Sequence, residues 1–152
     1  MAISRLADST CSVARSLSIL GERWTLLIIR ESLAGVTRFE TFRENLGLAP
    51  NILSERLATL VEHGILTRGA YQVSGRRTQA EYFLTPAGYE LHVVIGALQQ
   101  WGDVHVPRVE GPSVARQQIG TGAGVRVGFV DSSGHEVPQA EVEIVDLEAA
   151  RA

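Results

Sequence analysis

The sequence predicts an α+β fold, mainly helical: a winged helix-turn-helix with flanking dimerisation helices and a small C-terminal β-hairpin extension. Two short amphipathic segments, residues 37–46 and 50–63, are separated by a turn at Gly47, which is typical of the helix pair in a helix-turn-helix. Two strand-like runs follow and meet at residues 74–77, which contain a glycine and two arginines. A helix pair followed by such a hairpin fits nucleic acid better than it fits catalysis.

The segment before this motif predicts two helices. Thr10 is a suitable N-cap for the first, in which apolar residues recur at helical spacing up to Gly21. The second runs from Trp24 to Leu33 and is apolar on nearly every face. It should therefore be the central buried helix, with Trp24 in the core.

Residue types at the helix ends define the motif itself. Thr37 and Glu40 have the spacing of a capping box, which predicts that the first helix of the motif begins at Thr37. Pro50 at the first helical position begins the second helix, and Gly64 ends it. Leucines at positions 53, 57 and 60 fall on one side of the second helix and should face the core.

The opposite side of the second helix carries polar residues that suit the recognition of double-stranded DNA. Asn51 has the amide geometry to pair with adenine, Glu55 can accept a hydrogen bond from cytosine, and Ser54 can contact a base or a phosphate. Arg56 lies at the flank, where it suits a phosphate better than a base. A solvated helix face would have the same composition, so this prediction depends on the hairpin that follows.

The predicted hairpin, residues 65–73 and 78–84, has Arg76 and Arg77 at its tip. At that place a wing would contact phosphates or the adjacent minor groove.

The charge distribution favours the same segment, although the net charge of the chain is −3. Residues 23–80 hold eight arginines and five acidic residues, a balance of +3, whereas residues 81–152 hold four arginines and ten acidic residues, a balance of −6. The basic charge therefore lies on the segment that is expected to meet DNA.

Thr85 and Pro86 predict the start of a further helix, whose apolar stripe is too wide for one packing partner. This stripe either packs on its own domain or forms a dimer seam with the first helix. We favour dimerisation, because one small DNA-binding unit rarely binds tightly alone whereas paired units on paired half-sites do. The stripe comprises Leu91, Val94, Ile95, Leu98 and Trp101.

Several short motifs occur in one order over residues 10–105: Cys11, Gly21–Thr25, Arg38–Phe39, Leu48–Leu57, Gly64–Leu66 and Glu81–Gly88. Together they resemble the HxlR-type family of bacterial winged-helix transcription regulators. The resemblance implies a homodimer that binds a palindromic or pseudo-palindromic operator, with the Asn51–Arg56 segment in the major groove and the hairpin as wing. Two residues depart from the family pattern: Ala49 replaces the usual Ser N-cap, and Asn51 stands where Lys is common. The predicted DNA-binding residues are Thr37, Arg38, Pro50, Asn51, Ser54, Glu55, Arg56, Arg76 and Arg77.

Cys11 is the only cysteine, which excludes an internal disulfide. It is expected in the first turn of a helix, where backbone N–H groups and the helix dipole stabilise a thiolate, and Arg15 could add a positive charge. Some members of the resembled family sense oxidants or electrophiles through a cysteine at this position. Cys11 is therefore a candidate redox or electrophile sensor, and the alternative is a small apolar filler near the dimer seam.

The composition predicts three parts: residues 1–105 as the DNA-binding and dimerisation domain, residues 106–124 as a Gly/Pro-rich linker, and residues 125–152 as the extension. The strands of the extension are expected at 125–130 and 141–145. An isolated hairpin is marginally stable, so this one should pack on the core, on the other subunit or on a ligand. Two roles stay open, a dimer-stabilising appendage and one wall of a pocket for a small-molecule effector.

Catalysis has little support in the sequence. The histidines at 63, 92, 105 and 135 lack metal-ligand spacing, and no phosphate-binding loop or nucleophile motif is present. We therefore expect no enzyme activity, cofactor or metal. The lack of a signal peptide or a long apolar run predicts a cytoplasmic protein without a membrane partner.

The favoured interpretation is thus a homodimeric, sequence-specific, DNA-binding transcription regulator that responds to an unknown signal. One alternative is a repressor of the MarR type, which also has a winged helix and senses small ligands. Another is a winged-helix protein-interaction module without DNA affinity, which the acidic residues Glu55 and Glu62 and the negative net charge would suit. The operator, the effector and the direction of regulation do not follow from the sequence.

Overall fold

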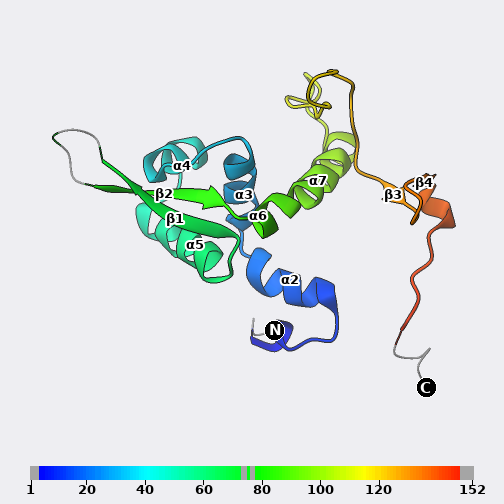
Figure 1. Cartoon of the computed structure of the whole chain (residues 1–152), viewed down its shortest axis with the longest axis horizontal. Coiled ribbons are helices and arrows are strands. Elements are labelled where there is room, and N and C mark those ends of the chain that lie inside the picture. The colour runs from blue at the N-terminus through cyan, green and yellow to red at the C-terminus, as the bar shows by residue number, and fades with distance from the viewer. Residues whose placement is uncertain (1–3, 73–74, 76–77, 148–152) are drawn as a thin grey trace. The chain divides into compact units, whose positions relative to one another are not determined.

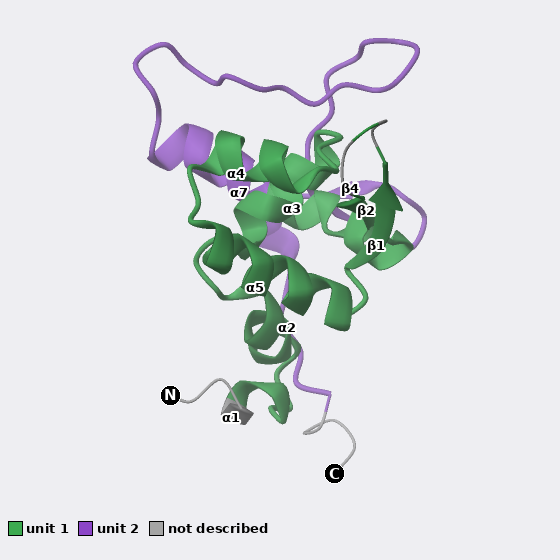
Figure 2. Cartoon of the chain, turned by 90° about the vertical axis from the view of Figure 1, so that its left-hand side faces the viewer, with its two compact units in different colours: residues 1–95 green, residues 96–152 purple. Residues whose placement is uncertain are grey.

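The computed structural model describes residues 4–72, 75 and 78–147 (Figure 1). The chain divides into two compact units, residues 1–95 and 96–152 (Figure 2). The division falls inside a helix, earlier than the domain boundary that the composition suggests after residue 105.

The first unit is mainly helical and contains one antiparallel two-stranded sheet. Helix, turn, helix and hairpin follow one another as the sequence predicts, which confirms the winged helix-turn-helix architecture. In chain order the elements are α1 (Ser4–Ala7), α2 (Ser12–Leu20), α3 (Thr25–Leu33), α4 (Phe39–Leu46), α5 (Pro50–Glu62), β1 (Leu66–Tyr71), β2 (Gln79–Leu84), α6 (Pro86–Glu90) and α7 (His92–His105), which begins in this unit.

The core of the first unit lies between α3, α4, α5 and the hairpin. The centre of α3 is buried, as expected for the central helix. Trp24 is its N-cap and packs against the core while partly exposed, so it lies at the core's edge and not within it. Among the described residues, the fully buried apolar side chains are Ile28, Ile29, Phe42, Leu53, Leu57, Leu60 and Leu66.

The start of α4 differs from the prediction. The helix begins at Phe39 with Arg38 as N-cap, and no side chain caps its first turn. Thr37 and Arg38 instead pair with β2: the Thr37 hydroxyl donates to Glu81 Oε1 at 3.4 Å, and Arg38 forms an isolated β-bridge with Glu81. The capping box predicted for Thr37 and Glu40 is therefore wrong, because Arg38 is the N-cap and the hydroxyl and carbonyl of Thr37 are hydrogen-bonded to Glu81 and to the Tyr82 N–H on β2.

Two other helix boundaries also differ from the prediction. The N-cap of α2 is Cys11 and not Thr10. The single helix expected after Thr85 is divided at Leu91 into α6 and α7, although Thr85 caps α6 as predicted by accepting a hydrogen bond from the Gly88 amide at 3.1 Å. The apolar stripe is divided as well. Leu91 and Ile95 pack with the core, whereas Val94, Leu98 and Trp101 are exposed.

The second unit contains most of α7, the antiparallel pair β3 (Phe129–Val130) and β4 (Glu136–Val137), and the 3-10 helix η1 (Gln139–Glu141). The turn at 131–134 is confirmed, but the second strand is not at 141–145. Asp131 Oδ1 accepts hydrogen bonds from the backbone N–H groups of Ser133 and His135, which closes a tight turn. The residues immediately after the turn therefore become the partner strand.

The segment expected to be a linker carries structure of its own and packs on α7. Gln117 and Gly124 form an antiparallel bridge. The side-chain amide of Gln100 clamps Val127 by donating to its carbonyl at 2.9 Å and accepting from its N–H, and Gln99 donates to the Val114 carbonyl at 2.6 Å. None of the helices in the described residues is long and apolar enough to cross a membrane.

Candidate nucleic-acid interface

Helix α5, the second helix of the motif, has one buried and one exposed side. Leu53, Leu57 and Leu60 are fully buried, as their spacing predicts, and they fix the rotation of the helix about its own axis. Asn51 and Ser54 are exposed on the other side, and Glu55 and Pro50 are exposed with them. The helix starts without a side-chain cap, because Ala49 occupies the N-cap.

A short turn sets the angle between α4 and α5. Gly47 ends α4 with φ +63°, a left-handed conformation that favours glycine, and Leu48 next to it is buried.

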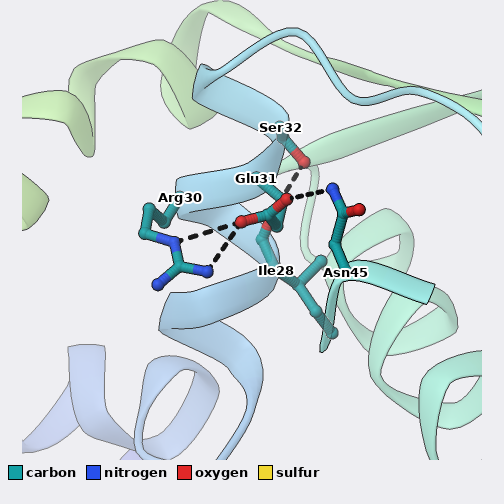
Figure 3. A network of polar contacts seen from close by, with 5 residues as sticks. All are labelled: Ile28, Arg30, Glu31, Ser32 and Asn45. Atoms are coloured by element: carbon teal, nitrogen blue, oxygen red, sulfur yellow. Dashed lines mark hydrogen bonds and ion pairs between the residues drawn. The ribbon is translucent and has the colours of Figure 1, made fainter. Parts of the chain in front are cut away.

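Figure 3 shows how α3 holds the end of α4. The Glu31 carboxylate accepts from Asn45 Nδ2 at 2.6 Å and pairs with the Arg30 guanidinium at 2.7 Å. The buried hydroxyl of Ser32 is satisfied on the same helix, since it donates to the Ile28 carbonyl at 3.0 Å. The Asn45–Glu31 hydrogen bond thus links the end of α4 to the central helix.

Arg38 joins the start of α4 to the wing. Its Nε lies 3.4 Å from Glu81 Oε1 on β2, and its guanidinium carbon lies 4.4 Å from the centre of the Tyr71 ring on β1. The side chain is still more than half exposed, so it can also meet a phosphate. Thr37 shares Glu81, which makes this carboxylate the anchor of the wing base.

Arg56 differs from the other predicted contacts, because it is largely buried. Its Nη2 lies 2.9 Å from Glu22 Oε2 in the segment between α2 and α3, and its Nη1 lies 3.4 Å from Glu55 Oε1. Its Nε is buried without a hydrogen-bond partner. A phosphate contact by Arg56 stays a prediction, and it would require the guanidinium to leave Glu22.

The structure therefore groups the predicted residues into two sets: Pro50, Asn51, Ser54 and Glu55 on α5, and Thr37 and Arg38 at the wing base. Arg76 and Arg77 lie outside the described residues. The partners that hold the site, which are Glu22, Tyr71 and Glu81, do not follow from the sequence patterns. Only Glu22 and Glu81 carried a signal, because both fall within the short family motifs, but nothing in those motifs indicated their contacts.

Cys11 is exposed at the start of α2. The Arg15 guanidinium next to it donates to the carbonyls of Ser9 and Thr10 at 2.6 Å and 2.8 Å. The arginine therefore holds the chain that enters the helix. Among the described residues no group of three or more potential ligands could hold a metal ion.

Comparison with known proteins points in one direction. The model of the HxlR-like helix-turn-helix family matches residues 19–110. The uncharacterized HTH-type transcriptional regulator Rv3095 of Mycobacterium tuberculosis is 48% identical over 103 residues, which are 68% of this chain and 64% of that protein. The chain thus aligns with somewhat less than two thirds of that relative's length.

Two solved structures extend the comparison. The putative transcription factor PA1607 is 32% identical and superposes with a TM-score of 0.77 over 93% of this chain and 98% of its own, so the match includes most of the C-terminal unit. The redox regulator HypR in its reduced form is 25% identical, with a TM-score of 0.57 over 66% of this chain and 98% of its own.

Proposed function

Since the chain belongs to the HxlR-like helix-turn-helix family and is a transcription regulator with a helix-turn-helix DNA-binding fold, we propose that it binds a palindromic or pseudo-palindromic operator as a homodimer. The observation that carries this proposal is the exposed polar side of α5. Three buried leucines lie opposite, and Arg38 fixes a wing beside the helix pair. A helix with this arrangement can enter a major groove while the wing contacts the backbone.

In this proposal some of the residues read bases and others contact the DNA backbone. Asn51 and Glu55 read base edges, and Ser54 contacts a base or a phosphate. Thr37, Arg38 and Pro50 lie where the backbone would pass the start of each helix. Arg76 and Arg77 hold the DNA backbone without reading sequence.

Replacing Asn51 by alanine is expected to weaken binding to the operator by about 1 to 3 kcal/mol and to leave binding to random DNA nearly unchanged. Asn51 is exposed, so the loss reports a base contact and not a folding defect. Gel shifts with operator and random duplexes measure both affinities. Glu62→Gln, at the far end of α5, is the control and should bind like the parent. Equal losses on both duplexes for Asn51→Ala would refute the assignment.

The double substitution of Arg76 and Arg77 by alanine should weaken binding to the operator and binding to random DNA to a similar extent. Each lost phosphate contact also lowers the slope of log affinity against log salt by about 1. A salt titration of both duplexes checks this result. An unchanged slope would remove the two arginines from the interface.

The same gel shifts separate DNA binding from the alternative of a protein-interaction module. The parent chain should bind duplexes selected from a random library and prefer them to an unselected duplex. If it binds neither, the winged helix serves another partner. A MarR-type ligand-responsive repressor would bind DNA as well, so gel shifts do not separate it from an HxlR-type regulator. The match to the HxlR-like family model favours the HxlR-type regulator.

We further propose that Cys11 senses a signal, supported by its exposure and by the likeness of the chain to the redox regulator HypR. As the only cysteine, it can act by joining two subunits, by forming a mixed disulfide or by alkylation. Diamide or quinone should change operator affinity in the parent and leave Cys11→Ser unaffected. An unchanged affinity in the treated parent would leave Cys11 as a packing residue. A small-molecule effector, cytoplasmic action and the lack of catalysis stay parts of the proposal.

A further inference from the structure

The ion pair between Glu22 and Arg56 links two parts of the first unit that the proposed function treats separately. Glu22 directly follows Gly21, the C-cap of α2, and Arg56 lies in the second turn of α5. Their side chains are only 35% and 16% exposed, and the charged atoms are 2.9 Å apart. Separating the members of a partly buried ion pair leaves each with an uncompensated charge. The pair therefore opposes movement of the Glu22 segment relative to α5.

Helix α2 is attached near the end that carries Glu22. Ile19 and Leu20, at the end of the helix, pack against the core, whereas Val13 and Leu17 nearer its start are exposed. The Gly21 amide donates to the Leu17 carbonyl at 2.9 Å, so the last turn of α2 runs directly into the Glu22 segment. Exposed apolar residues along such a helix suit contact with a second copy of the chain.

Arg56 is held from the opposite direction by α5 itself. Its neighbour Leu57 is fully buried, and Glu55 before it lies on the proposed base-reading face. A displacement of Glu22 would therefore be transmitted through Arg56 to the part of α5 that carries the proposed base-reading residues.

We propose that Glu22 is a positioning residue that fixes the recognition helix α5 relative to the dimer-forming helix α2, and so sets the half-site spacing that the dimer accepts. The inference rests on the proposed function, because spacing has a meaning only for a dimer on paired half-sites. Glu22 itself contacts no DNA. It acts through Arg56, whose buried Nε has no hydrogen-bond partner and whose guanidinium would turn outward once the carboxylate is neutralised.

The test compares operators in which the half-sites are kept at their selected spacing or moved together or apart by about two base pairs. The parent protein should prefer the selected spacing. Glu22→Gln keeps the size of the side chain, removes its charge, and should reduce this preference by about fivefold or more. Arg56→Met removes the partner and the unpartnered Nε while keeping the aliphatic stem, so it should fold and lose the preference to a similar extent.

Glu110→Gln is the matched control, because it changes the net charge equally and breaks an exposed pair with Arg108 in the other unit. It should keep the preference of the parent. Thermal unfolding followed by circular dichroism verifies that each variant is folded at the assay temperature.

The inference is overturned if Glu22→Gln and Arg56→Met keep the full spacing preference. It is also overturned if Glu22→Gln binds all duplexes more tightly by one common factor while Arg56→Met weakens them all, because Arg56 would then be a phosphate contact that Glu22 merely masks. If the parent itself shows no spacing preference, the dimeric function fails and the inference fails with it. Failure of the inference alone, in which the parent keeps its spacing preference, is thus distinguishable from failure of the dimeric function, in which the parent has none.

Discussion

Gly88→Ala is expected to lower the free energy of unfolding by more than about 3 kcal/mol, which is a large effect for one added methyl group. Gly88 is buried in α6, and a Cβ there would lie 2.3 Å from the Ile65 carbonyl oxygen and 2.8 Å from Leu84 Cδ2. The Ile65 oxygen cannot easily retreat, since it accepts hydrogen bonds from the N–H and the hydroxyl of Thr85 at 3.1 Å and 3.2 Å. The clash is with backbone and must move the junction of recognition helix, hairpin and α6.

Gly102→Ala is the control for this experiment. Gly102 lies inside α7 with no heavy atom within 4 Å of an added Cβ, so alanine should stabilise the helix by up to about 1 kcal/mol. Urea unfolding followed by circular dichroism compares both variants with the parent. If Gly88→Ala unfolds at the same urea concentration as the parent, the close packing of α6 on the hairpin is incorrect.

Gly47 and Gly64 show which parts of the fold could be predicted from sequence. Both adopt positive φ, at +63° and +68°, directly after α4 and α5, where the sequence predicts helix ends. The leucine spacing in α5 likewise predicts which side is buried. These signals are local, because a helix end or a helix face is determined by residues a few positions apart.

The misplaced elements depend on contacts between distant residues. Thr37 has the residue type of an N-cap, but its hydrogen bond to Glu81 requires β2, which lies far along the chain. The break at Leu91 arises where one helix must pack with the core and then continue beyond it, and no turn residue marks that place. Propensity is a weak predictor wherever tertiary packing decides.

In the candidate site, too, features set by local helical spacing could be predicted, whereas contacts between distant segments could not. Asn51, Ser54 and Glu55 are exposed as helical spacing predicts. Helical spacing places Arg56 only at the flank of the helix, and it gives no indication of the ion pair with Glu22 in another segment. In the C-terminal unit, Gln99 and Gln100 have the composition of a solvated helix face, yet they bind the backbone carbonyls of Val114 and Val127. Side-chain to backbone contacts of this kind leave no periodic signal.

The extension also clarifies which side of α7 is left for a second subunit. Gly96, Gln99 and Gln100 lie on one side of the helix and face the chain that follows α7: Gln99 binds the Val114 carbonyl, Gln100 binds the Val127 carbonyl, and a Cβ at Gly96 would come within 2.8 Å of Val127. Leu98 and Trp101 lie on the other side and are 49% and 61% exposed. The proposed dimer seam on α7 is therefore the side that the chain's own extension does not cover.

Leu98→Asp should consequently give a monomer that folds but binds the operator about 100-fold or more weakly than the parent. The isolated chain tolerates aspartate, because Leu98 is half exposed, whereas a two-fold seam would bring two carboxylates into an apolar contact. Sedimentation at micromolar concentration measures the assembly, and gel shifts measure the loss of paired half-site binding. In the parent dimer the two recognition helices should lie about 34 to 36 Å apart or at a multiple of that distance.

Val109→Asp provides the matched control, since Val109 is an exposed valine in the segment 106–124 that follows α7 and its replacement introduces the same charge. It should stay dimeric and bind the operator like the parent. If Leu98→Asp remains dimeric with full operator affinity, the seam lies elsewhere, and α2 alone must supply it. If the parent chain sediments as a monomer at micromolar concentration, the homodimer is wrong, because two separate recognition helices would then have to find their half-sites without the gain in effective concentration that a preformed pair provides.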